Sequence, residues 1–329
     1  MKMIICEFNR YSQLGTISTK KRDRMAIALV LGGGGARGLA HMGVLKVLEQ
    51  ENIRFDMIVG CSFGALIGGM YAQSANISVV QTRMEEFKKS KEYRDLGVKM
   101  LQKPSFASDD FMRQFARNIR DRVLLNVIVN RISVLKEDRL INSINFLIKD
   151  ILIENTKIKF ACNTTDLVSG RPILFTKGKM REAVLASTTI PGYFPPLEVN
   201  GKRFVDGAVT YNLPIKFAKE LGARNIIAVD VHSVLQRDCD FKNVFDVILR
   251  TSTITSAMLT EESLDEADVI ITPDVGKYLW YDFDKSDELI AAGEEATYSK
   301  LADVNALSLK QKKWDIFDFF KKGIKRKQN

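Results

Sequence analysis

The chain has 329 residues, of which 46% are hydrophobic and 27% charged, and its net charge is +9 at pH 7. This length can bury one large core or two modest ones. The longest uncharged apolar stretch, residues 57–72, is shorter than the roughly 20 residues that a membrane-spanning helix needs. The positive charge is concentrated in residues 1–24 and 310–329, so the sequence predicts no nucleic-acid-binding cleft in between.

Residues 1–24 show no periodic pattern, and we expect a loose basic leader before a domain that begins at Met25. The four cysteines are far apart and lack the spacing of metal ligands; they are Cys6, Cys61, Cys162 and Cys239. This spacing predicts no metal site, and we expect no cofactor. The scattered thiols suit a reducing cytoplasm.

A glycine-rich loop follows the first predicted strand, residues 25–31. The apolar spacing of residues 39–48 predicts a helix directly after it. Bare N–H groups and a helix N-terminus together favour an anion here. The pattern is also found in dinucleotide-binding folds, so an oxidoreductase is one alternative. The loop residues are Gly33, Gly34, Gly35, Ala36, Arg37 and Gly38.

A strand, a sharp turn and a helix are predicted around Ser62, in the sequence Gly60, Cys61, Ser62, Phe63, Gly64. Flanking glycines let the backbone bend tightly and lift the serine hydroxyl clear of the sheet. Ser62 is therefore the candidate nucleophile. In a parallel sheet it would meet the glycine loop at the carboxyl edge, where the loop would act as an oxyanion hole. This strand does not end in the acid that a ribose needs, which disfavours the oxidoreductase.

Residues 77–153 have mainly helical patterns, which predict either a cap-like insertion over the site or core packing. Two strand-like segments, 157–162 and 171–175, and a proline-stiffened loop, residues 186–196, come next. The following strand ends in Asp206, Gly207 and Ala208, where a carboxylate would face the cleft of Ser62. By spacing alone, an ordinary Asp-Gly turn is the favoured interpretation.

The remaining chain continues to alternate between strands, at 225–232 and 268–271, and helices, at 240–262 and 284–304. This alternation predicts an α/β fold with a mostly parallel sheet flanked by helices. We expect one domain over residues 25–275, a C-terminal helical segment over 276–309 and a basic amphipathic tail over 310–329.

The order of these motifs resembles the patatin-like phospholipase family, particularly its bacterial members. The resemblance covers residues 25–275 and departs from the family at Cys61, where a small Thr or Ala is expected. It implies a patatin-like fold of three α/β/α layers, with a helical insertion after the nucleophile helix. It also implies a serine acylhydrolase acting on lipid acyl esters, such as phospholipids or lysophospholipids. It rests on Gly33-x-Gly35-x-Arg37-Gly38, Gly60-x-Ser62-x-Gly64, Ala186-Ser187 with Pro191, Phe194, Pro195 and Pro196, and Asp206-Gly207-Ala208.

The resemblance also implies roles for individual residues. Ser62 would be the acyl-accepting nucleophile, Asp206 would complete a Ser-Asp dyad, and residues 33–38 would supply the oxyanion donors. The two histidines, His41 and His232, leave a triad as an alternative. Ser62, Asp206 and His232 follow the chain order of α/β-hydrolases, although the family gives no histidine a part.

Two functions from other classes compete with the acylhydrolase. One is a non-catalytic lipid-binding or regulatory module on the same fold, and the less favoured one is the dinucleotide-binding oxidoreductase. A fluorophosphonate probe that reacts with activated serines would separate the enzyme from both.

The C-terminal tail has an amphipathic pattern. On a helical wheel Ile316, Phe317, Phe320 and Ile324 fall on one side, and Asp318, Lys321, Lys322 and Lys325 fall on the other. We expect peripheral, salt-sensitive contact with an anionic membrane; packing on the domain is the competing explanation. The expected location is the cytoplasm or the inner face of its membrane.

Overall fold

The structure is a computed structural model that describes residues 6–7, 26–97, 132–232 and 244–310. Most of the predicted leader and almost all of the predicted tail lie outside these ranges, as does the middle of the helical insertion. Within the described ranges no helix is long and apolar enough to cross a membrane.

One mixed sheet forms the centre of the described chain, in the order β1-β5-β4-β3-β2-β8-β9. The five neighbouring strands from β4 to β9 are parallel, which confirms the predicted mostly parallel sheet. The strands are β1 (Cys6–Glu7), β2 (Ile27–Leu31), β3 (Met57–Cys61), β4 (Lys159–Asp166), β5 (Arg171–Phe175), β6 (Leu197–Val199), β7 (Lys202–Asp206), β8 (Asn225–Val229) and β9 (Val269–Ile271).

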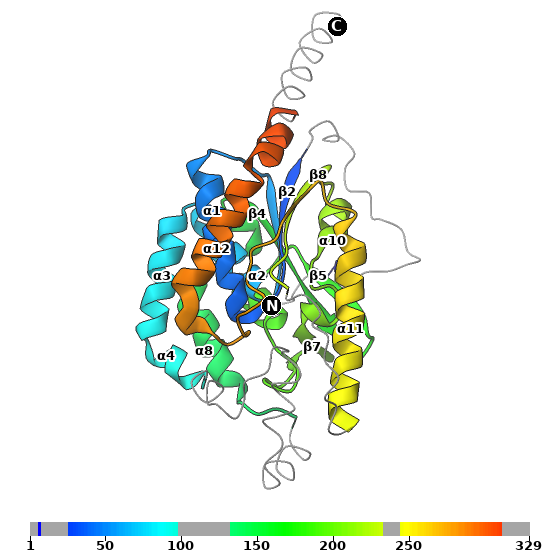
Figure 1. The fold of residues 1–329 in the computed structure, drawn as a ribbon. Coiled ribbons are helices and arrows are strands. Elements are labelled where there is room, and N and C mark those ends of the chain that lie inside the picture. Colours follow the sequence, from blue (N-terminus) through cyan, green and yellow to red (C-terminus); the bar gives the residue numbers. More distant parts are fainter. Residues whose placement is uncertain (1–5, 8–25, 98–131, 233–243, 311–329) are drawn as a thin grey trace, which may run out of the picture.

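Alternate residues of the central strands face two separate apolar cores, because successive side chains of a strand point to opposite faces. In β2, Ile27, Leu29 and Leu31 join the larger core, whereas Ala28 and Val30 join the smaller one. Helices cover both faces (Figure 1), which agrees with the predicted layers.

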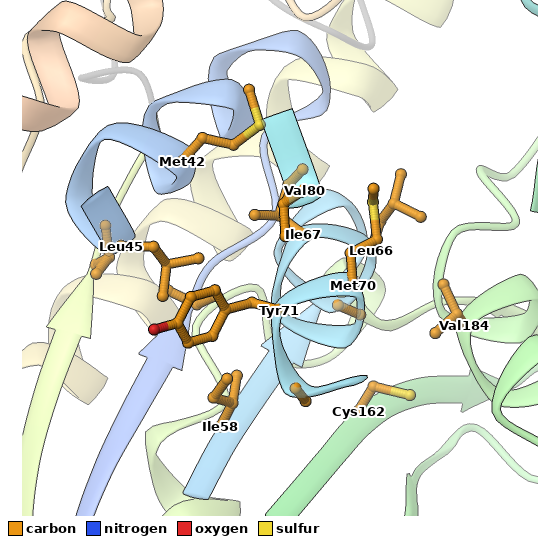
Figure 2. Packing of buried hydrophobic residues seen from close by; sticks show 14 of the residues in the cluster. Met42, Leu45, Ile58, Leu66, Ile67, Met70, Tyr71, Val80, Cys162 and Val184 are labelled. Carbon is orange, nitrogen blue, oxygen red and sulfur yellow. The ribbon is translucent and has the colours of Figure 1, made fainter. Parts of the chain in front are cut away.

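The larger core lies under seven helices: α1 (Ala40–Gln50), α2 (Phe63–Ser74), α3 (Ile77–Lys89), α4 (Lys91–Asp95), α8 (Glu137–Leu147), α9 (Met180–Ser187) and α12 (Ser286–Ser299). Two others cover the smaller core: α10 (Ile215–Glu220) and α11 (Val244–Leu264). Figure 2 shows α2 at the centre of the larger core, with Leu66, Met70 and Tyr71 among side chains from neighbouring elements. The helix that follows Ser62 is therefore enclosed by protein.

Strand β4 is longer than its neighbour β3, and this difference determines where Asp206 lies. Residues 159–163 of β4 pair with β3, but residues 164–166 extend beyond its end. On the edge that β3 leaves free, β7 pairs with these residues in the antiparallel direction. As a result β7 lies in line with β3, runs in the opposite direction, and ends near the carboxyl end of β3.

The segment after residue 275 packs closely on the first part of the domain. Helices α1 and α12 cross at Gly43 and Gly293, where a Cβ on either glycine would collide with a backbone carbonyl of the other helix. Lys46 and Glu294 form an ion pair of 2.7 Å across the same contact. The predicted helical segment 276–309 is thus anchored on the helix that follows the glycine loop.

Candidate active site

Ser62 occupies a strained turn between β3 and α2. Its φ of 51° and ψ of −122° lie outside the regions that L-residues prefer, as in a nucleophile turn of α/β enzymes. Both flanking glycines are required sterically. A Cβ on Gly60 would lie 2.6 Å from the Cα of Ala65, and one on Gly64 would collide with the carbonyl of Leu31.

Because the carboxyl ends of β3 and β7 meet beside β4, Asp206 lies next to Ser62. The hydroxyl Oγ of Ser62 donates a hydrogen bond of 2.5 Å to Oδ2 of Asp206. The other carboxylate oxygen accepts the N–H of Ala208 at 2.8 Å and lies 3.9 Å from the thiol of Cys61. The two residues that the sequence assigned to one cleft are therefore in direct contact.

Both members of this pair are shielded from solvent, Ser62 being 8% exposed and Asp206 4%. Burial raises the pKa of Asp206 from its ordinary value to about 6, although hydrogen bonds from Ser62, Ala208 and Cys61 act in the opposite direction. At neutral pH the carboxylate is mostly ionised and is a stronger base than an exposed aspartate.

The glycine loop lies against the nucleophile turn. A Cβ on Gly33 would be 3.1 Å from the Cβ of Ser62, so the two segments are in contact. The N–H of Gly33 donates to the carbonyl of Asn212 at 3.1 Å, and that of Ala36 donates to the carbonyl of Trp280 at 2.6 Å.

The N–H groups of Arg37 and Gly38 bond within the short 3-10 helix Gly35–Leu39, so two N–H groups of the loop remain. Among the described residues, the N–H groups of Gly34 and Gly35 have no hydrogen-bond acceptor. Gly35 has a φ of 58°, and a Cβ there would collide with the carbonyl of Trp280. Arg37 is 4% exposed, and its Nε donates to the carbonyl of Gly34 at 3.4 Å. This arginine is therefore part of the interior and supports the loop.

Neither histidine is hydrogen-bonded to the Ser62–Asp206 pair in the described part of the chain. His41 is fully buried, and its Nε2 donates to the carbonyl of Gly32 at 2.8 Å. The Nδ1 of His232 accepts from the amide of Asn212 at 3.5 Å. Burial lowers the pKa of each histidine to about 4, so both are neutral at pH 7.

An apolar cavity opens beside Ser62. Its walls come from α2, α3, α4, α8, residues 188–194 and residues 280–283. Helices α3 and α8, which belong to the predicted insertion, provide aliphatic and aromatic wall residues such as Phe87 and Leu140. Lys88 also lines the cavity, and its ammonium donates to the hydroxyl of Ser286 at 2.5 Å.

Three residues that the sequence did not assign to the site contact it directly. Ser187 is fully buried at the end of α9, and its Oγ accepts the N–H of Ser62 at 3.0 Å. Trp280 holds the glycine loop through its carbonyl, and Asn212 does the same through its own. Ser187 lies within the Ala186-Ser187 motif, but the backbone carbonyls of Asn212 and Trp280 leave no signal in the sequence.

A family model described as patatin-like phospholipase matches residues 29–219. The chain belongs to this family. The match includes Ser62, Asp206 and the glycine loop, whereas Trp280 and the rest of the segment after residue 275 lie beyond it. The family predicted from the sequence is thereby confirmed.

Curated relatives of this patatin-like protein are considerably longer chains. It is 35% identical to the lysophospholipase NTE1 of Mycosarcoma maydis over 210 residues. This aligned region covers 64% of this chain and 10% of that protein. It is 33% identical over 247 residues to the neuropathy target esterase sws of Drosophila melanogaster, covering 74% and 15% respectively. Among solved structures, VipD from Legionella pneumophila aligns with a TM-score of 0.41 and 12% identity, over 86% of this chain and 67% of that one.

Proposed function

We propose that this patatin-like protein is a serine acylhydrolase in which Ser62 attacks lipid esters and Asp206 is the base. The observation that supports this most strongly is the hydrogen bond of 2.5 Å between Ser62 Oγ and Asp206 Oδ2, beside an apolar cavity. A serine hydroxyl is a weak nucleophile unless a neighbouring base takes its proton. The buried carboxylate, with its raised pKa, suits that task.

The reaction proceeds in two halves. Asp206 takes the proton of Ser62 as Oγ bonds to the ester carbonyl carbon, and it then gives this proton to the departing alkoxide, which leaves as an alcohol. A water molecule next loses a proton to the same carboxylate and attacks the acyl-enzyme. The fatty acid departs, and the proton returns to Oγ of Ser62.

The N–H groups of Gly34 and Gly35 are the proposed donors to the oxyanion. Gly33 and Ala36 already donate to other carbonyls. Arg37 and Gly38 lie inside the short 3-10 helix Gly35–Leu39, where their N–H groups bond within the helix. Of the six loop residues, Gly34 and Gly35 are left. A fixed donor to a developing oxyanion typically contributes about 3 kcal/mol to transition-state stabilisation. The loop would therefore matter to the rate nearly as much as the base.

The proposed substrate is a lipid ester whose acyl chain lies in the apolar cavity. The walls from α3 and α8 support the interpretation of residues 77–153 as an insertion that shapes an acyl pocket. The names of the relatives, lysophospholipase and esterase, favour a lysophospholipid or a related lipid ester as the substrate. We propose residues 25–275 as the hydrolase domain, with the segment 276–309 completing its cavity.

Two parts of the proposal concern the surroundings of the enzyme. The amphipathic tail over residues 310–329 would bring the protein to an anionic membrane, where its substrate resides. A cytoplasmic location agrees with the scattered cysteines. Removing the tail should weaken sedimentation with anionic vesicles and leave hydrolysis of a soluble ester unchanged.

A fluorophosphonate probe tests the proposed activity. It should label the wild type in proportion to time, leave Ser62→Ala unlabelled and label Ser143→Ala at the wild-type rate. Ser143 is a suitable control because it is a buried serine that also lines the cavity and donates to the carbonyl of Arg139. A folded wild type that never reacts would favour the non-catalytic lipid-binding module instead.

A further inference from the structure

Asn163 is a polar residue in the buried part of β4, and its side chain is fully enclosed. In the sheet it pairs with Cys61, the residue before the nucleophile. A buried polar group that lacks a hydrogen-bond partner costs about 1–3 kcal/mol of folding free energy. The hydrogen bonds that the Asn163 amide does make are therefore important at this position.

The amide nitrogen of Asn163 has two such partners, both in the segment that follows Asp206. It donates to the carbonyl of Gly207 at 3.1 Å and to that of Tyr211 at 2.9 Å. These acceptors determine the orientation of the amide, because its oxygen in the same place would face two carbonyl oxygens. The amide oxygen is buried without a hydrogen-bond partner among the described residues.

Close packing also links Asn163 to the Asp206 turn. A Cβ on Gly207 would lie 2.6 Å from the amide nitrogen of Asn163, so the turn leaves no space between them. The same turn supplies the N–H of Ala208, which orients the carboxylate of Asp206. A displacement of the amide would thus be transmitted to the base.

The segment held by Asn163 continues to the glycine loop. Tyr211 accepts from Asn163, and the carbonyl of the next residue, Asn212, accepts the N–H of Gly33 at 3.1 Å. Gly33 in turn is in contact with Ser62. One side chain is therefore connected to all three parts of the site.

We propose that Asn163 is a positioning residue that does not touch the substrate. Its backbone pairs with Cys61 and its amide holds the segment from Gly207 to Tyr211, so that the nucleophile turn, the Asp206 turn and the glycine loop keep their mutual arrangement. This inference rests on the proposed function. A misplacement of about 1 Å at a reacting group can cost on the order of 100-fold in rate, so the arrangement is worth preserving.

Thr165 provides a matched control. It lies two residues further along β4 on the same face, is 2% exposed, and shares a hydrogen bond of 2.9 Å with the hydroxyl of Thr210. This bond also links β4 to the segment after Asp206, but it joins two side chains instead of the backbone beside Asp206 and Asn212. Thr165→Val removes a comparable buried bond without releasing those backbone carbonyls.

The test compares Asn163→Leu, which preserves volume, with Thr165→Val in the full chain on a soluble ester. We expect Asn163→Leu to lower kcat by about 100-fold with KM changed less than about threefold. Thr165→Val should keep kcat within about threefold. The midpoint of the pH profile of kcat/KM should rise in Asn163→Leu only, because a weakened bond from Ser62 no longer lowers the pKa of Asp206.

Equal losses of kcat in the two variants, or an unchanged kcat in Asn163→Leu, would overturn the inference. If Asn163→Leu does not fold, Asn163→Ser replaces it, with an expected loss of about tenfold because its hydroxyl donates only one hydrogen bond; full activity would contradict the inference. A wild type without activity would instead refute the proposed function, so the two failures remain distinguishable.

Discussion

Two aspartates in neighbouring strands of the sheet expose almost the same small fraction of their surface, but their pKa values shift in opposite directions. Asp166, at the end of β4, is 3% exposed, and Asp206, at the end of β7, is 4% exposed. Burial alone would raise both pKa values. In Asp166 hydrogen bonds from Ser169, Val168 and Arg203 outweigh burial and lower the pKa, whereas in Asp206 burial prevails.

The two carboxyls differ in depth and in their donors. Asp206 lies deeper in the protein than Asp166, so burial raises its pKa more strongly. Asp166 accepts the hydroxyl of Ser169 at 2.7 Å and two backbone N–H groups, and none of these donors takes part in the proposed reaction. Asp206 accepts one backbone N–H, a long thiol contact and the hydroxyl that it is proposed to deprotonate. Asp166 is thus organised to remain ionised, and Asp206 to exchange a proton.

The largest expected effect separates the two aspartates by activity. Asp206→Asn removes the proposed base and should lower kcat for a soluble ester by about 10⁴-fold. Asp166→Asn changes a hairpin turn and should keep kcat within about threefold. Steady-state kinetics of both purified variants provide the measurement, and a comparable loss in Asp166→Asn would show that the comparison is wrong.

Gly35 and Gly170 provide a second comparison between a residue of the candidate site and one of the Asp166 turn. Both glycines have a positive φ. A Cβ on Gly35 would collide with the carbonyl of Trp280 and displace the loop, so Gly35→Ala should lower kcat/KM by about 100-fold. Gly170, in the turn after Asp166, has a φ of 68° and nothing within 4 Å of an added Cβ. Gly170→Ala should therefore lose some stability but little activity; equal activity losses would show that backbone strain alone is responsible.

The pH profile reports on Asp206 alone. Protonated Asp206 cannot take the proton of Ser62, so kcat/KM should rise about tenfold per pH unit below the pKa and level off above about pH 6. Asp166→Asn should leave this midpoint unchanged. A profile that is flat between pH 5 and 7, measured with a substrate that does not titrate, would contradict the assignment of the base.

Stability should respond to the two aspartates with opposite signs. Folding raises the pKa of Asp206 from 3.8 to about 6. Its ionised carboxylate therefore lowers the free energy of unfolding by up to about 3 kcal/mol above pH 6, and this penalty disappears below pH 3.8, where the carboxyl is protonated in both states. The pKa of Asp166 is lowered when folded, so its charge stabilises the protein at neutral pH, and this is lost as pH falls through the folded pKa.

Urea unfolding between pH 4 and 8 measures this difference. Asp206→Asn should be at least as stable as the wild type at pH 8, with an advantage that shrinks towards pH 4. Asp166→Asn should be less stable at pH 8. A destabilised Asp206→Asn at pH 8 would mean that the hydrogen bonds of the carboxylate outweigh its burial.

The sequence predicted those parts of the structure that are determined by residues close together in the chain. Apolar runs and glycines determine β2, β3 and the turn at Ser62, so both strands and the nucleophile turn were predictable. The antiparallel course of β7 was not, because it depends on β4 extending beyond β3. Ser187 and Asn163 likewise act on residues more than 40 positions away, and such pairings leave no periodic pattern.

The central claim, a serine activated directly by an aspartate, is tested most directly by removing each histidine. His232→Ala and His41→Ala, if folded, should retain most of the wild-type kcat/KM for a soluble ester, because neither imidazole is hydrogen-bonded to Ser62 or Asp206 in the described structure. In a triad, loss of the histidine would cost about 10⁴-fold or more. A His232→Ala enzyme as inactive as Ser62→Ala would contradict the dyad and make Asp206 the orienting acid behind a histidine base.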